Sequence, residues 1–472
     1  MLALLRSILN LARLLLLFLA FLLLYPFLKK RSVFLFLKFA GPSFIKLGQA
    51  LSTRPDLVGR AMAETLSHFQ DKLTPFSPKL VKKIMQRESG SDFSQKFVEF
   101  NFVAQASASI AQVHRAVILV DENGRENSAN KFSQKSSSSA TTGSAVRRKV
   151  AVKILRPRIK QIVARDIATL SLIAKLLQPF AKFTAKTLHD INLVLKESTK
   201  SELNLLKEAA NAMRLKHNLQ GLAAEGVLFY VPQIFLKYST PNILVSEWID
   251  GVPFSNQAAI HAAPFDKKQI ARNLVISYFT QVYSDGFFHA DMHPGNLFLM
   301  NKGAHAGAIA VVDFGIMGEI DKKMRIAVAE IFIGFLHEDY KKVAQLHIDA
   351  GLVPANTSVY DLALSCQKIG EIIGGSSVKE ISLATLLTHL IAMTREYQMI
   401  ARPELLLLQK TLLLVEGVGV MLDDELNIWD LARPWVKEWA KKNIGFDAKI
   451  RDALVDLFDA VRGAIKAHKG GV

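Results

Sequence analysis

Cysteine is almost absent from this sequence, and several motif classes are missing with it. Cys366 is the only cysteine among 472 residues, so no intrachain disulfide can form and a reducing compartment fits best. No zinc-ligand spacing and no nucleic-acid-binding motif occurs. Acidic residues are the minority, because 59 basic against 42 acidic residues give a formal net charge of +17. This excess favours an anionic partner, and we expect anionic membrane lipids rather than nucleic acid.

The sequence does contain one long apolar run. Residues 14–28 carry no charge, with Arg13 before them and Lys29, Lys30 and Arg31 after them. A membrane-spanning helix needs about 20 apolar residues, so a membrane anchor competes with a buried core helix and with a signal peptide. No small-residue cleavage site follows the run. We therefore predict a membrane anchor, spanning or re-entrant, whose basic flank leaves the rest of the chain on the cytoplasmic side.

The pattern of apolar residues predicts an α+β fold with a strand-containing lobe before a mainly helical lobe. Strands are expected at 149–155, 242–247, 297–300 and 308–312, with alternating residues also over 100–120. Long helical patterns fill 158–220 and most of the chain after residue 266. The predicted domains are an anchor at 1–32, a helical extension at 33–100, a small lobe at 101–246 with a disordered insertion at 121–148, a large lobe at 247–420 and a helical extension at 421–472.

Residues 106–113 have the spacing of the glycine-rich loop that covers ATP in kinases, with alanine at all three glycine positions. A methyl group at each position restricts positive φ and the approach of the backbone to phosphate, so we expect a stiffer loop. The candidate nucleotide-binding residues here are Ala106, Ser107, Ala108, Ser109, Ile110 and Val113.

A strand lysine follows this loop. Lys153 ends a VAVK sequence of the type that holds the α- and β-phosphates in kinases. A glutamate on a helix is expected to orient it, and Glu202 and Glu208 both lie in one predicted helix over 190–215. Because they are six residues apart they do not share a face, and the sequence leaves the choice open. Glu247 and Ile249 are further candidates for nucleotide binding.

The strongest motif is His289-Ala290-Asp291 followed by Asn296, with Asp313-Phe314-Gly315 further on. Asp291 is the candidate catalytic carboxylate, which positions the acceptor or attacking water. Asn296 and Asp313 are the candidate ligands of Mg²⁺ beside ATP. Together with the loop and Lys153, these motifs occur in the order found in kinases, which predicts a kinase-like two-lobe fold.

Two features of protein kinases are missing. Ala290 occupies the position of the arginine that receives an activation-loop phosphate, and no A-P-E follows Gly315. The chain is expected to pass from 316–320 straight into a helix. Phosphorylation of a protein is therefore less expected than ATP hydrolysis or phosphorylation of a small or lipid molecule.

The segment before the small lobe contains Lys46-x-Gly48-Gln49, whose lysine and glutamine share one helical face. With this motif the sequence resembles the UbiB family of atypical kinases and ATPases linked to ubiquinone biosynthesis. The other matching positions are Ser52-x-Arg54-x-Asp56, Ala108 to His114, Glu202-Leu203-Asn204, His289 to Asn296, and Asp313 to Gly315. Departures from the family pattern are Asn204 for aspartate, and Met292 and Ala104 for proline.

The resemblance implies that the K-x-G-Q helix lies over the site where a kinase would bind a peptide. Lys46 and Gln49 are then expected to face the nucleotide pocket, with Lys46 contacting acidic residues. It also implies use of ATP and Mg²⁺, residence at the bacterial inner membrane with the kinase-like part in the cytoplasm, and ATPase activity responsive to membrane and quinone precursors. Other ubiquinone-biosynthesis proteins are expected partners. The alternatives are a non-catalytic nucleotide-binding scaffold and a regulatory protein kinase of a biosynthetic hydroxylase.

Overall fold

A computed structural model describes most of the chain as two compact units. The described residues are 2–28, 30–52, 58–67, 74–89, 96–121, 146–179, 182–220, 229–375, 393, 396–397, 399 and 402–444. Unit 1 comprises those within Met1–Arg214, Pro232–Ile249 and Asp313–Ile316, and unit 2 comprises those within Leu215–Val231, Asp250–Val312 and Met317–Val472. Most of the predicted insertion, the end of the C-terminal extension, Arg54, Asp56 and the side chain of Glu202 lie outside the described residues.

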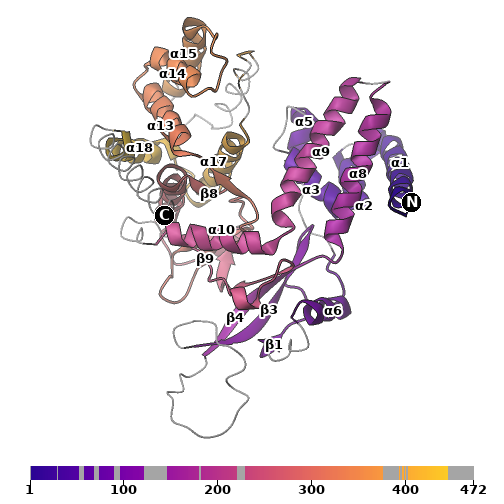
Figure 1. The fold of residues 1–472 in the computed structure, drawn as a ribbon. Helices are drawn as coiled ribbons and strands as arrows, with labels where there is room; N and C mark the ends of the chain where they lie inside the picture. Colours follow the sequence, from indigo (N-terminus) through magenta and orange to yellow (C-terminus); the bar gives the residue numbers. More distant parts are fainter. Residues whose placement is uncertain are drawn as a thin grey trace, which may run out of the picture. The chain divides into compact units, whose positions relative to one another are not determined.

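Unit 1 contains an antiparallel sheet in the order β1-β3-β4-β6, with β2 paired to β3 (Figure 1). The strands are β1 (Glu99–Phe100), β2 (Ala106–Ser107), β3 (Ala111–Val120), β4 (Val146–Leu155) and β6 (Ile243–Glu247). Alternate residues of β3 and β4, such as Ile118 and Val152, are fully buried against helix α6 (Pro78–Ser89). The period-two pattern of these strands therefore produces one of the unit's apolar cores.

Helices form the rest of unit 1. They are α1 (Leu2–Leu28), α2 (Lys30–Ala40), α3 (Pro42–Leu51), α5 (Arg60–Ser67), α8 (Ile159–Leu177), α9 (Lys182–Glu202) and α10 (Leu205–Asn218), whose last residues belong to unit 2. Helix α3 packs along α9 and against α2. A Cβ at Gly48 of the K-x-G-Q motif would lie 2.8 Å from Cδ1 of Leu37, so a larger residue there would displace the end of this leucine side chain. The glycine thus permits close helix packing.

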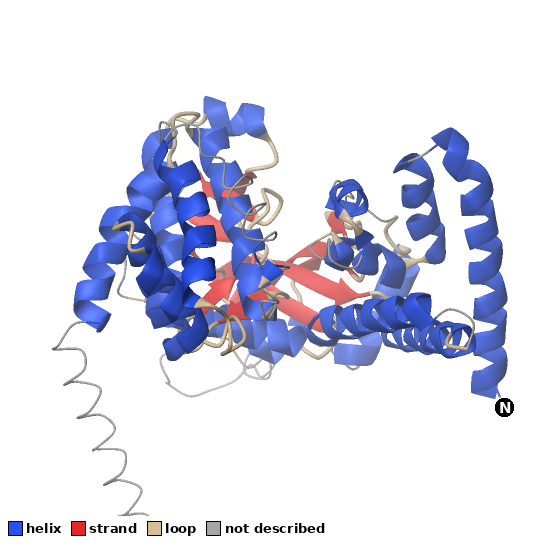
Figure 2. Ribbon diagram, turned by 90° about the horizontal axis from the view of Figure 1, so that it is seen from above, coloured by secondary structure: helices blue, strands red, loops and turns tan. Residues whose placement is uncertain are grey.

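Unit 2 is mainly helical, and its strands are short (Figure 2). One sheet has the order β5-β10-β9-β7 and a second pairs β11 with β8. The strands are β5 (Phe229–Tyr230), β7 (Gly251–Pro253), β8 (Phe287–His289), β9 (Leu297–Met300), β10 (Ile309–Val311) and β11 (Met317–Glu319). The helices are α11 (Gln257–Ala262), α12 (Lys267–Phe279), the π-helix η4 (Thr280–Asp285), α13 (Lys322–Leu336), α14 (Tyr340–Asp349), α15 (Val359–Gly375), α17 (Pro403–Leu422) and α18 (Ile428–Ile444).

The predicted helix over 190–215 was wrong, because the chain breaks at Leu203 and Asn204 into α9 and α10. Asn204 precedes the first residue of α10, and its side-chain oxygen accepts a hydrogen bond from the backbone N–H of Leu206 at 3.2 Å. A short amide side chain at this position is a typical N-cap. Glu202 and Glu208 are therefore on different helices.

Three other predictions of local structure need correction. Strand β4 begins at Val146, so residues 146–148 belong to the sheet rather than to the insertion. Strands β7, β8 and β11 were missed, because none of these three-residue strands lies in a β-branched apolar run like the AIAVV of residues 308–312 around β10. The chain after Gly315 therefore forms β11 before α13 begins at Lys322.

Candidate active site

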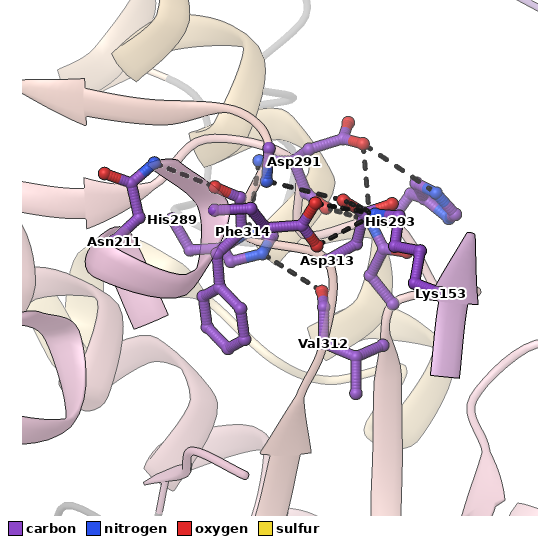
Figure 3. Close-up of polar contacts among 11 residues, drawn as sticks. Lys153, Asn211, His289, Asp291, His293, Val312, Asp313 and Phe314 are labelled. Carbon is purple, nitrogen blue, oxygen red and sulfur yellow. Dashed lines mark hydrogen bonds and ion pairs between the residues drawn. The ribbon is translucent and has the colours of Figure 1, made fainter. Parts of the chain in front are cut away.

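In unit 1, Lys153 lies between two carboxylates. It sits on β4, between β3 and β6, and its Nζ donates hydrogen bonds to Oε1 and Oε2 of Glu208 at 2.8 and 2.9 Å. The same Nζ donates to Oδ1 of Asp313 at 2.9 Å (Figure 3). Lys153 thus pairs with Glu208, and the choice between the two glutamates that the sequence left open is resolved.

The two carboxylates determine the charge state of this lysine. Burial alone would lower the pKa of Lys153, but the negative charges of Asp313 and Glu208 raise that pKa above its ordinary value. Lys153 is therefore a fixed cation. Asp313 remains half-exposed, whereas Glu208 is almost fully buried.

The backbone around Asp313 adopts an uncommon conformation. Asp313 has a φ of 65°, in the left-handed region that few non-glycine residues occupy. The amide of Asn211, on α10, donates to the carbonyl oxygen of Phe314 at 3.0 Å and holds the segment to this helix. The same helix carries Glu208, so one element positions both ends of the Lys153 cluster within unit 1.

In unit 2, Asp291 is the centre of a second cluster. Nδ2 of Asn296 donates to the backbone oxygen of Asp291 at 3.0 Å and to its Oδ2 at 3.3 Å. Nζ of Lys410 donates to Oδ1 of Asp291 at 3.0 Å, and Nε2 of His293 lies 3.8 Å from Oδ2. These contacts orient the carboxylate that the sequence predicts to be catalytic.

His289 holds the backbone of this loop. It is fully buried, its Nδ1 accepts from the backbone N–H of Asp291 at 3.2 Å, and its Nε2 lies 3.2 Å from the carbonyl oxygen of Val312. The pattern fits the tautomer with hydrogen on Nε2. The N–H of Val312 in turn donates to the carbonyl oxygen of Asn296 at 3.0 Å. His289 is therefore a structural residue that ties the Asp291 loop to the strand leading to Asp313.

Lys410 was not predicted from the sequence. It lies on α17, where leucines surround it, and Pro403–Leu422 is one of two helices in the described part of the chain that are long and apolar enough to cross a membrane by length and composition. The helix nevertheless packs on α12, and its Leu408 carbonyl accepts a hydrogen bond from Tyr278 at 3.1 Å. Lys410 is the only lysine of this apolar helix. A charged side chain on such a helix needs a charged or polar partner, so its position could have indicated a contact like the one with Asp291.

Arg156 is, after Lys410, a second site residue that the sequence did not predict. It holds residues 106–113, which we call the alanine loop. Arg156 donates from Nε and Nη2 to the carbonyl oxygen of Ala108 at 3.1 and 2.9 Å, and from Nη2 to the hydroxyl of Ser107 at 2.9 Å. Its guanidinium also reaches the carbonyl of Thr74 at 3.2 Å. Arg156 therefore joins the loop to residues 74–77, the segment directly before α6.

The remaining candidates have varied surroundings. The side chain of Ile110 packs in the core with Leu155 and Leu244, and Ser109 is buried, whereas Ala106 and Val113 are paired across β2 and β3. Glu247 ends β6, and its N–H donates to Gln233 at 2.8 Å. Ile249 is the last residue of unit 1 before Asp250 begins a segment of unit 2. Lys46 and Gln49 are partly buried on α3. Their roles toward a nucleotide stay predictions.

The predicted magnesium ligands are Asp313 in unit 1 and Asn296 in unit 2. Among the described residues there is no group of three or more histidine, cysteine, aspartate or glutamate side chains that could hold a metal by itself. Mg²⁺ usually takes one or two carboxylates, with phosphate oxygens and water completing its shell. Asp313 has a carboxylate and Asn296 an amide oxygen, which are ligand types that Mg²⁺ accepts, and their binding of a metal stays a prediction.

Comparison with known proteins gives matches over most of the chain. Residues 68–126 and 139–347 match the family model for the ABC1 atypical kinase-like domain, and residues 366–427 match the UbiB helical domain. A protein named "Probable protein kinase UbiB" from Erwinia tasmaniensis is 37% identical over 447 residues, covering 91% of this chain and 75% of that protein. The protein of the same name from Azotobacter vinelandii is 37% identical over 406 residues, covering 86% of this chain and 70% of that protein.

One solved structure is also similar. Its title is "The complex structure of Rv3197-erythromycin from Mycobacterium tuberculosis", and it covers 82% of this chain and 90% of its own chain with 22% sequence identity and a TM-score of 0.49.

Proposed function

The chain belongs to the UbiB family of ABC1 atypical kinase-like proteins, and from this premise we propose that it binds Mg-ATP at a membrane and hydrolyses or transfers the terminal phosphate. We propose further that this activity supports ubiquinone biosynthesis by acting on lipid quinone precursors or presenting them. The bacterial inner membrane is the proposed location, with the kinase-like part in the cytoplasm. Other proteins of the biosynthesis are proposed partners.

One observation carries the proposal, namely the position of Lys153 between Glu208 and Asp313. A strand lysine paired with a helix glutamate is the arrangement that holds the α- and β-phosphates in kinases. Glu208 is almost fully buried, so it fixes the lysine, whereas the half-exposed Asp313 would exchange its contact with the lysine for a metal ion. Lys153 would then remain charged and contact the phosphates.

The proposed roles of the other residues follow from their contacts. Mg-ATP would supply the phosphoryl group and a divalent charge, and Asp313 and Asn296 would hold the metal. Asp291 would orient the hydroxyl or water that attacks, since Lys410 and Asn296 fix its two oxygens and its backbone. The short chain between Gly315 and α13 supports a small or lipid acceptor over a protein, because 316–321 include β11 and leave no room for a long activation segment.

The test is Mg-dependent ATP turnover by the purified full-length protein and by Asp313→Asn, with and without vesicles that contain a quinone-like phenol. We expect the substitution to abolish turnover, because an amide removes the charge that holds the metal. Asp349→Asn, which changes an exposed aspartate on α14, is the matched control and should keep full turnover.

Three outcomes would contradict parts of the proposal. Unchanged turnover in Asp313→Asn would rule out the assigned metal site. Indifference of the wild type to the vesicles would separate ATP chemistry from the membrane. Complementation of a quinone-deficient strain by Asp313→Asn would favour a nucleotide-binding scaffold instead of an enzyme.

A further inference from the structure

Helix α1 has the length of a membrane span. Its segment Leu9–Leu28 has a mean hydropathy of 2.4. At about 1.5 Å per residue it extends about 30 Å, which equals the thickness of the hydrocarbon core of a bilayer. Length and composition therefore permit α1 to cross a membrane. Whether it can do so depends on its contacts with the rest of unit 1.

One face of α1 packs against unit 1 through apolar side chains. Leu14 is buried, and Leu17 and Phe21 pack in the same cluster, together with Leu37 of α2 and Leu170 of α8. Leu14, Leu17 and Phe21 are separated by three and four residues, so they lie on one helical face. The packed face therefore extends over about two turns in the middle of the apolar segment.

The same face is also fixed by polar contacts near its start. Asn10 is buried, and its Nδ2 donates to Oδ1 of Asp166 at 3.2 Å and to the hydroxyl of Thr169 at 2.9 Å, both on α8. Asp166 is fully buried and accepts two hydrogen bonds from Arg165 at 2.8 and 3.0 Å. These polar groups belong to a protein interior, because a charged side chain in hydrocarbon costs about 3 kcal/mol or more.

Helix α2 runs back along α1. The rings of Phe36 and Phe21 lie 5.7 Å apart between centroids with a tilted geometry, and Arg13 donates to the carbonyl oxygen of Ala40, the last residue of α2. Residues later in α2 thus lie beside residues earlier in α1. If α1 crossed the bilayer, the 11 residues of α2 would return only about 16 Å, and α3 with its buried contacts would begin inside the hydrocarbon. Spanning is therefore incompatible with this packing.

The opposite face of α1 is apolar and uncovered within unit 1. Leu16 is 69% exposed, Leu23 is 74% exposed and Phe27 is 84% exposed, and Leu15, Leu19 and Leu22 are each at least half exposed. They recur every three or four residues, so they form one stripe, which we call the leucine stripe. A continuous apolar surface of this kind marks an interaction site.

The charge around the leucine stripe identifies its partner. The first acidic residue of the chain is Asp56, whereas the basic residues before it are Arg6, Arg13, Lys29, Lys30, Arg31, Lys38, Lys46 and Arg54. Lys30, Arg31 and Lys38 are exposed. Each basic residue near an anionic bilayer surface contributes about 1 kcal/mol of attraction. An apolar stripe with basic flanks and no acidic residue fits an anionic lipid leaflet.

We propose that α1 lies in the plane of the membrane, with the leucine stripe in one anionic leaflet and its opposite face on α2 and α8. The chain is then anchored without crossing the bilayer. This inference rests on the proposed membrane association and specifies how it is made.

Depth measurements test this arrangement. Leu19→Cys and Phe27→Cys are each labelled with an environment-sensitive fluorophore in the full-length protein. The labelled proteins are bound to vesicles of phosphatidylcholine and phosphatidylglycerol. Quenchers at shallow or deep positions of the acyl chains then report the depth of each fluorophore. Labelling is selective because Cys366 is buried, and burial raises the pKa of its thiol to about 12. Tyr360→Cys, an exposed position on α15, is the control.

The expected result is equal, shallow quenching at residues 19 and 27 and none at residue 360. A spanning helix would separate the two labels by about 12 Å in depth, so deep quenching at 19 with shallow quenching at 27 would overturn the in-plane arrangement while leaving membrane association intact. No quenching at either position would overturn both the arrangement and the membrane part of the proposed function, whereas ATP turnover is measured separately.

A paired substitution gives a second readout. Leu19→Gln with Phe27→Gln removes apolar area from the leucine stripe without entering the core, and vesicle binding should weaken about tenfold or more. Tyr360→Gln should leave binding unchanged. Wild-type binding should weaken when phosphatidylglycerol is omitted, and equal binding to phosphatidylcholine alone would contradict the anionic partner.

Discussion

Each unit of this protein contains a lysine paired with a carboxylate, and the two pairs, Lys153–Glu208 in unit 1 and Lys410–Asp291 in unit 2, differ in burial. The Lys153 side chain is 17% exposed and its partner Glu208 is 4% exposed, whereas Lys410 and Asp291 are 28% and 25% exposed. Lys153 also binds two carboxylates, while Lys410 binds one. The difference indicates that the first pair contributes to folding as well as to the site, and that the second mainly orients one carboxylate.

The largest effect is expected from Lys153→Ala. It leaves the buried Glu208 carboxylate without a cation, and removing one partner of a buried pair costs about 3 to 5 kcal/mol of stability. ATP turnover should be lost as well. Urea unfolding without nucleotide measures the first effect, with Lys160→Ala, an exposed lysine on α8, as control. A stability loss no larger than that of Lys410→Ala would contradict the difference between the two pairs.

The double variant Lys153→Met with Glu208→Leu separates folding from function. Replacing both members of a buried ion pair by apolar residues is often neutral or stabilising, so stability should recover to about the wild-type value. Turnover should remain absent, because no cation is left for the phosphates. Recovered turnover would exclude Lys153 from the reaction.

Lys410→Met is expected to act on the rate rather than on stability. A partly exposed pair contributes about 1 kcal/mol or less, so the unfolding midpoint should move little. The Asp291 carboxylate loses one of its holding contacts, and kcat should fall by about 10- to 100-fold with KM for ATP nearly unchanged. Lys410→Arg should recover part of the rate. A changed KM with normal kcat would mean that Lys410 binds the nucleotide instead.

Arg156→Gln is expected to have a smaller effect on the alanine loop. The substitution removes the hydrogen bonds from Arg156 to Ala108 and Ser107. Because Arg156 also bonds to the carbonyl of Thr74, the alanine loop loses its connection to residues 74–77 and can move relative to them. KM for ATP should rise by about tenfold or less, since a hydrogen bond contributes about 1 kcal/mol. Arg158→Gln, at the exposed residue directly before α8, is the control. An unchanged KM would show that the loop does not need this arginine.

The smallest effect is expected at Lys268, which pairs with Glu425 at 3.1 Å on the surface of unit 2. Lys268→Ala should change neither turnover nor the unfolding midpoint measurably, because exposed pairs are screened by water and salt. A clear loss of stability there would mean that exposure does not explain the difference between the Lys153 and Lys410 pairs.

The sequence predicted the sheet of unit 1 better than the strands of unit 2. Long alternating strands such as β3 and β4 bury one face and leave a readable period of two. The three residues of β8 or β11 carry no period, and their pairing depends on contacts between residues about 30 apart in the chain, such as Phe288 with Gly318. Gly318 has close contact with the Phe288 ring, which the sequence does not reveal.

The residues of the candidate site also divide into those that the sequence predicted and those that it did not. Lys153, Asp291, Asn296 and Asp313 were predicted, because their chemistry fixes both residue type and spacing within short motifs. Lys410 and Arg156 were not predicted, since each reaches its partner from a distant element and belongs to no motif. The pairing of Lys153 with Glu208 instead of Glu202 depended on the helix break at Asn204.

The sequence alone determined the family, the α+β fold class and the residues that carry the proposed chemistry, because local motifs and periodicity contain that information. Only the tertiary structure decided which glutamate meets Lys153, which lysine orients Asp291, and which face of α1 is buried on α8. These are contacts across long stretches of chain, and no local pattern specifies the partner of a single charged or apolar side chain.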